Sequence, residues 1–305
     1  MFWKKSGIII EPQKQYKWSQ SHCALPTALH LRGCLYRIYF ATRDAQNRSH
    51  TSYADVDFSD NVKVLNYARK PVLEPGMPGH FDDCGAIPTS IVRNGSKIFL
   101  YYVGWNTGKS DPIFYTSAGL AISEDNGNTF KKYGPPIMER SQYDPWAVLS
   151  YFVRKEENAW KMWYVSGLGF KKRGNKISSY YNIKYATSSN GIDWKRDGTT
   201  CLDFSSKKET NIARPWVILE EGIYKMWFCY NKGKGYRIGY AQSKDGIKWK
   251  RKDNDFGLDV TNNNWDSEIT TYPCIIECNG NKALLYNGNG YGKEGIGLAT
   301  SKIKI

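Results

Sequence analysis

Short apolar stretches of about nine residues recur along the chain, and they either alternate with polar residues or are apolar throughout. Such stretches, separated by Gly, Asn, Asp or Lys, are typical of β-strands. Three such stretches, each with its own sequence pattern, follow one another in a fixed order and together form one set. The set occurs five times along the chain. The middle stretches read YRIYFATRD (36–44), KIFLYYVGW (97–105), KMWYVSGLG (161–169), KMWFCYNKG (225–233) and KALLYNGNG (282–290).

In four of the five sets the third stretch ends in Ala-x-Ser, and in three of these an Asp-Gly or Asn-Gly turn and an aromatic-plus-basic strand follow, as in IGYAQSKDGIKWKR (238–251). These dipeptides allow the positive φ angles of tight hairpins. A four-stranded antiparallel unit repeated at this period is a propeller blade. The last set lacks its fourth strand, and the N-terminal WKKSGIIIE (3–11) matches it. The pattern therefore predicts an all-β, five-bladed β-propeller, one domain over 1–305, with its last blade closed by the N-terminal strand.

Composition restricts the classes of protein to consider. No apolar run is long enough for a membrane span, and the N-terminal apolar patch is too short for a secretory signal, so we expect a cytoplasmic protein without an integral membrane segment. The seven cysteines include no CxxC pair, which favours buried free thiols. The four histidines form no metal-ligand pattern, so neither a metal nor a cofactor is expected.

The formal net charge is +14, from 43 Lys and Arg against 29 Asp and Glu. The basic residues are spread over many turns rather than gathered in one tract. A generally lysine-rich composition explains this first, an anionic substrate second and nucleic acid third. No nucleic-acid partner is therefore expected.

Acidic residues precede the first strand of four of the five sets, and first strands of a propeller line its axis. We therefore predict a ring of carboxylates in a central funnel, although an acid at such a position is also a common turn former. Like charges round one axis repel one another, a cost that proteins usually tolerate for chemistry. The acids are Asp82, Asp83, Asp144, Glu209, Asp266 and Glu268, with His22, Trp146, Arg214 and Tyr272 among them.

Polar and aromatic residues near the funnel supply candidate substrate contacts. Arg43, Asp44 and Arg48 follow a middle strand and could pair at the surface or grip substrate hydroxyls or a carboxylate. Trp105 follows another middle strand and, with Trp146 and Tyr272, would form a stacking platform.

The motifs YFATRD, FDDCGAIP, YYVGWN, MWYVSG, DSEITTYP and YNGNGYGK resemble the five-bladed propeller glycosidases of glycoside hydrolase families 32, 43, 68 and 130. More narrowly, they resemble bacterial glycosidase-like proteins associated with surface-polysaccharide gene clusters. Those glycosidases carry an acidic box on their first strand, whereas this chain has SHCALPT (21–27), so their nucleophile is not carried over.

The resemblance implies a glycoside hydrolase-like enzyme acting on a sugar or glycoconjugate, in which one carboxylic acid protonates the leaving oxygen and another acts as base or nucleophile. We assign Asp83 and Asp144 as working carboxylates and Glu209 or Glu268 as proton donor. Arg43, Asp44, Arg48 and Arg214 would bind the substrate. A glycosyltransferase or phosphorylase of surface-polysaccharide synthesis is the first alternative, and a non-catalytic sugar-binding propeller is the second.

Overall fold

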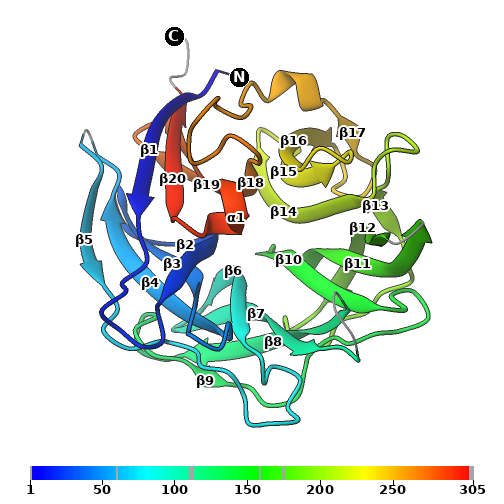
Figure 1. Cartoon of the computed structure of the whole chain (residues 1–305), viewed down its shortest axis with the longest axis horizontal. Coiled ribbons are helices and arrows are strands. Elements are labelled where there is room, and N and C mark those ends of the chain that lie inside the picture. Colours follow the sequence, from blue (N-terminus) through cyan, green and yellow to red (C-terminus); the bar gives the residue numbers. More distant parts are fainter. Residues whose placement is uncertain (1, 60, 110–112, 158, 174–175, 302–305) are drawn as a thin grey trace.

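The computed structural model describes residues 2–59, 61–109, 113–157, 159–173 and 176–301, and nearly all regular structure in them is β. Four sheets stand round a common axis (Figure 1). The first contains β2 (Ser21–Arg32), β3 (Leu35–Arg43), β4 (Ser49–Asp57) and β5 (Lys63–Tyr67) in that order. The second contains β6 (Ala86–Asn94), β7 (Lys97–Thr107), β8 (Phe114–Ser123) and β9 (Lys131–Lys132).

The third sheet has eight strands and consists of two meanders joined by one parallel bridge, Tyr181 to Asn211. Its first part holds β10 (Ala147–Lys155), β11 (Trp160–Arg173), β12 (Lys176–Ser188) and β13 (Thr200–Leu202). Its second part holds β14 (Asn211–Glu220), β15 (Ile223–Asn231), β16 (Tyr236–Ser243) and β17 (Lys250–Arg251), followed by the 3-10 helix η1 (Asp253–Asp255).

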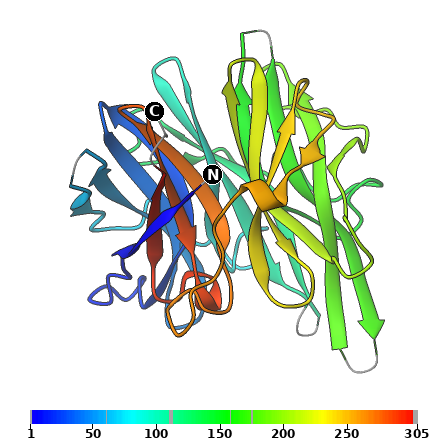
Figure 2. The same ribbon diagram turned by 90° about the horizontal axis from the view of Figure 1, so that it is seen from above.

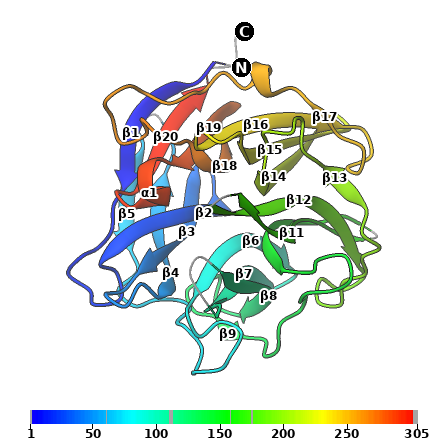
Figure 3. The ribbon, with the colours of Figure 1, turned by 45° about the vertical axis from the view of Figure 1, so that its right-hand side comes forward.

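The fourth sheet joins the two ends of the chain. Its order is β1 (Lys4–Ile10), β20 (Ile296–Ser301), β19 (Asn281–Asn287) and β18 (Thr271–Cys278). The antiparallel pairing of β1 with β20 is the one that the sequence predicts for the N-terminal strand. The short helix α1 (Asn289–Gly292) lies beside the start of β2, where the His22 N–H donates to the Lys293 carbonyl at 3.4 Å (Figure 3). It is the one α-helix of the described residues, and its four residues are too few to cross a membrane.

The Ser-x-Asp/Asn-Gly turns lock neighbouring meanders together. Gly127, Gly191 and Gly246 all have positive φ, and each turn serine accepts a hydrogen bond from the glycine N–H. Each glycine carbonyl accepts from an aromatic side chain of the preceding meander, and a Cβ on Gly127 would come within 2.3 Å of that partner's oxygen. Only glycine therefore fits the turn. The donors are Tyr39 at 2.6 Å, Tyr101 at 2.8 Å and Trp163 at 2.6 Å.

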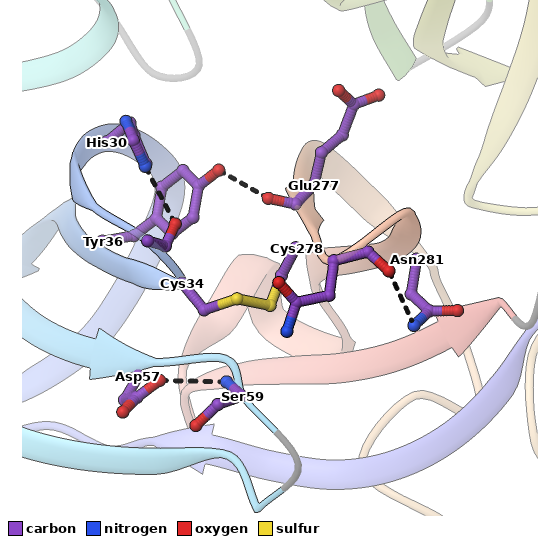
Figure 4. Close-up of a disulfide and its surroundings, with 10 residues drawn as sticks. His30, Cys34, Tyr36, Asp57, Ser59, Glu277, Cys278 and Asn281 are labelled. Atoms are coloured by element: carbon purple, nitrogen blue, oxygen red, sulfur yellow. Dashed lines mark hydrogen bonds between the residues drawn. A yellow bond between two sulfur atoms is a disulfide. The ribbon is translucent and has the colours of Figure 1, made fainter.

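The expectation that all seven cysteines are free thiols is wrong for two of them. Cys34, in the β2–β3 turn, and Cys278, at the end of β18, form a disulfide with a Cα–Cα distance of 5.2 Å (Figure 4). Beside it the Tyr36 hydroxyl donates to the Glu277 carbonyl at 2.7 Å. The bond ties the first sheet to the last. Disulfides persist in oxidising compartments and are rare in the cytoplasm. The cytoplasmic location stays a prediction.

We expect the double variant Cys34→Ser/Cys278→Ser to lose about 2–5 kcal/mol of unfolding free energy, because the disulfide restricts the unfolded chain over a separation of 244 residues. Urea denaturation with and without reductant measures this loss. Cys84→Ser, at a free and partly buried cysteine, is the control. Equal midpoints for the oxidised protein and the double variant would contradict the expectation.

Candidate functional site

A cavity of about 480 Å³ opens at the axis of the molecule. Residues of β2, β6, β10, β14 and β18, the strands nearest the axis in Figure 1, all contribute to its wall. The remaining wall comes from the end of β3, from the β3–β4 and β7–β8 connections, and from residues of β7, β8, β11, β12 and β16. A concave site built from several elements is where a ligand is expected in such a fold. The contributions of the five axial strands are Leu25, Ile87, Leu149, Ser150, Ala213 and Tyr272.

The axial strands are irregular where they reach the cavity. Register shifts interrupt the pairing of each of the five with its neighbour. His22, Leu25, Arg214 and Tyr272 also have φ angles of 50° to 64°, which cost energy for residues other than glycine. Bulges redirect side chains, and strained residues cluster at functional sites. The backbone of the axial strands therefore adopts strained conformations next to the cavity. Packing of the core alone does not explain them.

Tyrosines form one side of the cavity. The hydroxyls of Tyr181 and Tyr236 are hydrogen-bonded to each other. The Tyr291 ring lies 6.0 Å from that of Tyr236 and 6.3 Å from that of Tyr272. Burial raises the pKa of all four hydroxyls, so they are neutral and act as hydrogen-bonding groups. Trp105 faces this region from β7, held by a hydrogen bond from its Nε1 to Ser49 at 3.2 Å. Such a wall suits the apolar faces of sugar rings.

A guanidinium without a carboxylate partner stands in the same cavity. Arg43 donates to the Asn47 amide oxygen at 2.7 Å, and no ion pair involves it among the described residues. Burial lowers the pKa of Arg43, because desolvation disfavours the charged form. The acidic groups nearby do not offset its charge, since none of the described residues that line the cavity is Asp or Glu. The cavity therefore offers a cation to an anionic ligand.

His22 lies beside Arg43 and is predicted to be neutral at physiological pH. Burial, and then the charge of Arg43, lower its pKa from 6.5 to about 4. The unfolded chain thus binds more protons than the folded protein between these values, so stability falls as the pH drops from 6.5 towards 4. Allowing for partial exposure, we expect a loss of about 2 kcal/mol that is absent from His22→Gln. Urea denaturation across this pH range measures it, and a parallel loss in the variant would contradict the assignment.

Four of the predicted acids do not line the cavity. Asp82, Asp144, Glu209 and Asp266 are buried, and each forms an ion pair with a cation from the fourth strand or segment of its own unit. We call these four the clamp acids. The Tyr102 and Tyr286 hydroxyls also donate to Asp82 and Asp266, at 3.1 and 3.0 Å. The pairs are Asp82 with Lys132 at 2.5 Å, Asp144 with Arg196 at 3.1 Å, Glu209 with Arg251 at 2.8 Å and Asp266 with Lys5 at 2.6 Å.

The other two predicted acids keep accessible carboxylates. Asp83 is partly buried and accepts a hydrogen bond at 2.7 Å from the amide of Asn106, which alternates in β7 with the cavity residues Trp105 and Thr107, and Asp83 itself is not among the cavity-lining residues. Burial acts to raise the pKa of Asp83, but hydrogen bonds from the Gly79 N–H and Asn106 outweigh it and lower the pKa. Glu268 is exposed, and its carbonyl accepts from Arg237, next to the cavity residue Tyr236. The four predicted catalytic acids are thus not brought together as one ring.

Three other predicted binding residues, Trp146, Asp44 and Arg48, are not among the residues that line the cavity. Trp146 lies behind the cavity wall, where its Nε1 donates to the Phe114 carbonyl at 2.6 Å. Asp44 is buried and caps its own loop, accepting from Arg48 at 2.9 Å and from His50 at 3.2 Å. Arg48 thus forms the surface ion pair that the sequence left open as an alternative.

The prediction that Arg214 binds substrate is not supported by its contacts, all of which are to protein oxygens. It is fully buried below the cavity and donates to the Thr89 and Pro26 carbonyls and to the Thr89 and Thr27 hydroxyls. Arg214 therefore joins β14 to β2 and β6 at the axis.

Sequence reasoning missed two wall residues, Tyr181 and Tyr236. Each lies the same number of residues before the serine of its Ala-x-Ser motif, Ser188 or Ser243. Aligning the repeats on these serines could therefore have found both tyrosines. No cluster of three or more His, Cys, Asp or Glu in the described part of the chain is arranged to hold a metal ion.

Comparison with known proteins gives relatives over the whole chain. No protein-family model matches it. The uncharacterized protein Rv1502 of Mycobacterium tuberculosis is 38% identical over 300 residues, which covers 98% of this chain and 99% of the relative. A 1,2-beta-oligomannan phosphorylase of a Thermoanaerobacter species is 23% identical over 56% of this chain and 57% of its own length.

Solved structures of glycoside hydrolases share the fold. One described as a glycoside hydrolase superposes with a TM-score of 0.76 at 16% identity, over 98% of this chain and 91% of its own. A thermostable family-43 glycoside hydrolase superposes with a TM-score of 0.65 at 14% identity, over 92% and 88%. The architecture is thus that of the propeller glycoside hydrolases.

Proposed function

We propose that this chain, which belongs to the same family as the Mycobacterium tuberculosis protein Rv1502, is a carbohydrate-active enzyme whose substrate binds in the axial cavity. The observation that carries the proposal is the make-up of the cavity wall. Tyrosines and a tryptophan share this wall with a cation that has no carboxylate partner, and the pairing of each axial strand with its neighbour is irregular. Aromatic rings stack on sugars, and convergent polar groups fix their orientation.

The architecture that we propose for this enzyme is a closed five-bladed propeller. It counts the eight-stranded sheet as two blades, because its two meanders share one bridge, and it takes the β1–β20 pairing as the closure. Five blades would place five equivalent strands round the cavity, which agrees with the five strands that contribute to its wall.

Two carboxylates are available for glycosyl transfer to water. Cleavage needs one acid to protonate the leaving oxygen and a second carboxylate as base or nucleophile. The lowered pKa of Asp83 keeps it ionised and suits it to the second role. Glu268, whose side chain is exposed, is our candidate proton donor. The clamp acids, whose charges are satisfied by their own cations, would then support the fold.

A second candidate, transfer to or from a phosphate-bearing sugar, is favoured by Arg43. A cation without a carboxylate partner in a cavity whose described wall has no acid would bind a phosphate or another anionic group. The likeness to a 1,2-beta-oligomannan phosphorylase, over about half of the chain, points the same way. The substrate in this version is an anionic sugar or glycoconjugate.

A screen with aryl glycosides, glycosyl phosphates with sugar acceptors, and nucleotide sugars tests the proposal. Product release from aryl glycosides without phosphate would indicate hydrolysis, phosphate-dependent release would indicate phosphorolysis, and dependence on a nucleotide sugar would indicate transfer. Saturable sugar binding with no turnover in any class would contradict the enzyme and leave the non-catalytic alternative.

A further inference from the structure

The hairpin of β11 and β12 extends beyond the rest of its sheet. Pairing between the two strands continues to Arg173 and Lys176, whereas β10 stops pairing with β11 at Gly167. On the other side β14 meets β12 at the single bridge from Asn211. The outer part, which we call the arm (168–173 and 176–180), is therefore a two-stranded ribbon, and Figure 2 shows it in green projecting from the body. An isolated two-stranded ribbon is marginally stable, so such an extension calls for an explanation.

One face of the arm continues the wall of the cavity. Alternate residues of β12 lie on the same face, so Tyr181, which lines the cavity, shares its face with Ser179 and Ile177. Their partners across the ribbon on β11 are Phe170 for Ser179 and Lys172 for Ile177. This face therefore extends outward from the tyrosine wall for about 13 Å, at ~3.3 Å per residue.

Packing ties this face to the cavity. The Phe170 ring lies 4.3 Å from that of Trp146, which also contacts Tyr181 at 6.2 Å. Trp146 in turn bonds to the carbonyl of the cavity residue Phe114. Packed aromatic rings, with the buried Trp146 in the middle, thus join the cavity to the base of the arm.

The arm is cationic. The sequence GLGFKKRGNKISSYY (167–181) contains four Lys or Arg and no Asp or Glu. Lys171 and Lys172 are exposed, and no carboxylate pairs with either among the described residues. They stand on opposite faces, because they are successive in a strand, and the Lys171 ammonium lies 4.5 Å from the centre of the Tyr180 ring. Leu168 and Ile177 are each 37% exposed, so the arm also offers apolar contact area. Its unpaired cations suit an anionic ligand.

We propose that the face of the arm bearing Phe170, Lys172 and Ile177 is an outer subsite for an extended, anionic glycan whose reacting unit occupies the cavity. This inference rests on the proposed function and adds to it the substrate's class: a chain with acidic groups rather than a single sugar. Aromatic and aliphatic groups would contact the sugar rings, and Lys172 would pair with an acidic substituent.

Neighbouring lysines provide a matched test. Lys172→Glu and Lys171→Glu make the same charge change one residue apart, on opposite faces of the ribbon. Binding of polygalacturonate, heparin and neutral dextran to the full chain would be measured by calorimetry at low and high salt. We expect the unmodified protein to bind both acidic glycans at least about tenfold more tightly than dextran, with the difference reduced by salt. Lys172→Glu should remove about tenfold of that affinity and Lys171→Glu less than threefold.

Equal losses in the two variants, or equal binding of acidic and neutral glycans, would overturn the outer subsite. Binding to phosphatidylglycerol vesicles but to neither acidic glycan would also overturn it and indicate membrane docking. Turnover of a small substrate separates this inference from the proposed function. If a small substrate is turned over but Lys172→Glu binds acidic glycans as tightly as the unmodified protein does, only the outer subsite is refuted. If the acidic glycans bind as expected but no substrate is turned over, only the enzyme is refuted.

Discussion

Replacing Arg214 with alanine is expected to lower the free energy of unfolding by about 3–5 kcal/mol. Its side chain is fully buried and donates to four oxygens on two other strands: the Thr89 carbonyl at 2.5 Å and hydroxyl at 3.0 Å, the Pro26 carbonyl at 2.6 Å and the Thr27 hydroxyl at 3.0 Å. Alanine would leave these acceptors unsatisfied next to a cavity at the axis, and each unsatisfied buried group is costly. Burial already lowers the pKa of Arg214 to about 10, which reflects the price of holding a cation there.

Urea denaturation followed by tryptophan fluorescence measures this effect. Arg214→Lys retains the charge but loses the fork of donors, so we expect an intermediate loss and a protein that still folds. Arg43→Ala is the matched control, because the hydrogen bond that the Arg43 side chain makes in the described chain is to Asn47, and its removal should cost within about 0.5 kcal/mol. Unfolding midpoints for Arg214→Ala equal to those of the unmodified protein would contradict the role of this residue as an axial link.

Replacing Arg43 with methionine should lower activity rather than stability. We expect a loss of at least about 100-fold in kcat/KM for an anionic substrate, with the unfolding free energy nearly unchanged. The physical reason is that methionine keeps the apolar stem but removes the cation of the cavity, whose pairing with an anionic group would take place largely out of water.

Arg48→Met is the control for Arg43→Met, because it lies in the same loop and its exposed guanidinium is paired with Asp44. It should change kcat/KM less than threefold. Equal effects of the two substitutions, or full activity of Arg43→Met, would contradict anion binding at Arg43.

The repeats in the sequence predicted most of the fold. The order of strands, the tight turns at Gly127, Gly191 and Gly246, and the pairing of β1 with β20 follow from local patterns and from their recurrence. The disulfide between Cys34 and Cys278 could not be predicted, because the two residues meet only when the first and last sheets become neighbours.

The site was harder to predict, for a definite reason. The sequence placed acids before the first strands correctly, but the direction of their side chains depends on contacts with residues far away in the sequence. The partners of the clamp acids were visible as the basic residues of the aromatic-plus-basic strands. That Arg251 meets Glu209, or Lys132 meets Asp82, depends on how each meander folds back on itself. The contacts of Arg214 could not be predicted for the same reason, since its partners belong to two other sheets.

One set of measurements distinguishes the two proposed catalytic acids, Asp83 and Glu268, from the clamp acids. Asp83→Asn, Glu268→Gln, Asp144→Asn and Glu209→Gln would be compared for turnover per folded molecule and for urea midpoint, with the substrate identified by the screen. We predict that the first two lose at least about 1,000-fold in kcat with midpoints unchanged. The other two should lose about 3 kcal/mol of stability, because an ion-paired arginine is left buried, while turnover per folded molecule stays within a few-fold. Full activity in Asp83→Asn and Glu268→Gln, with loss of turnover in stably folded Asp144→Asn and Glu209→Gln, would contradict the account.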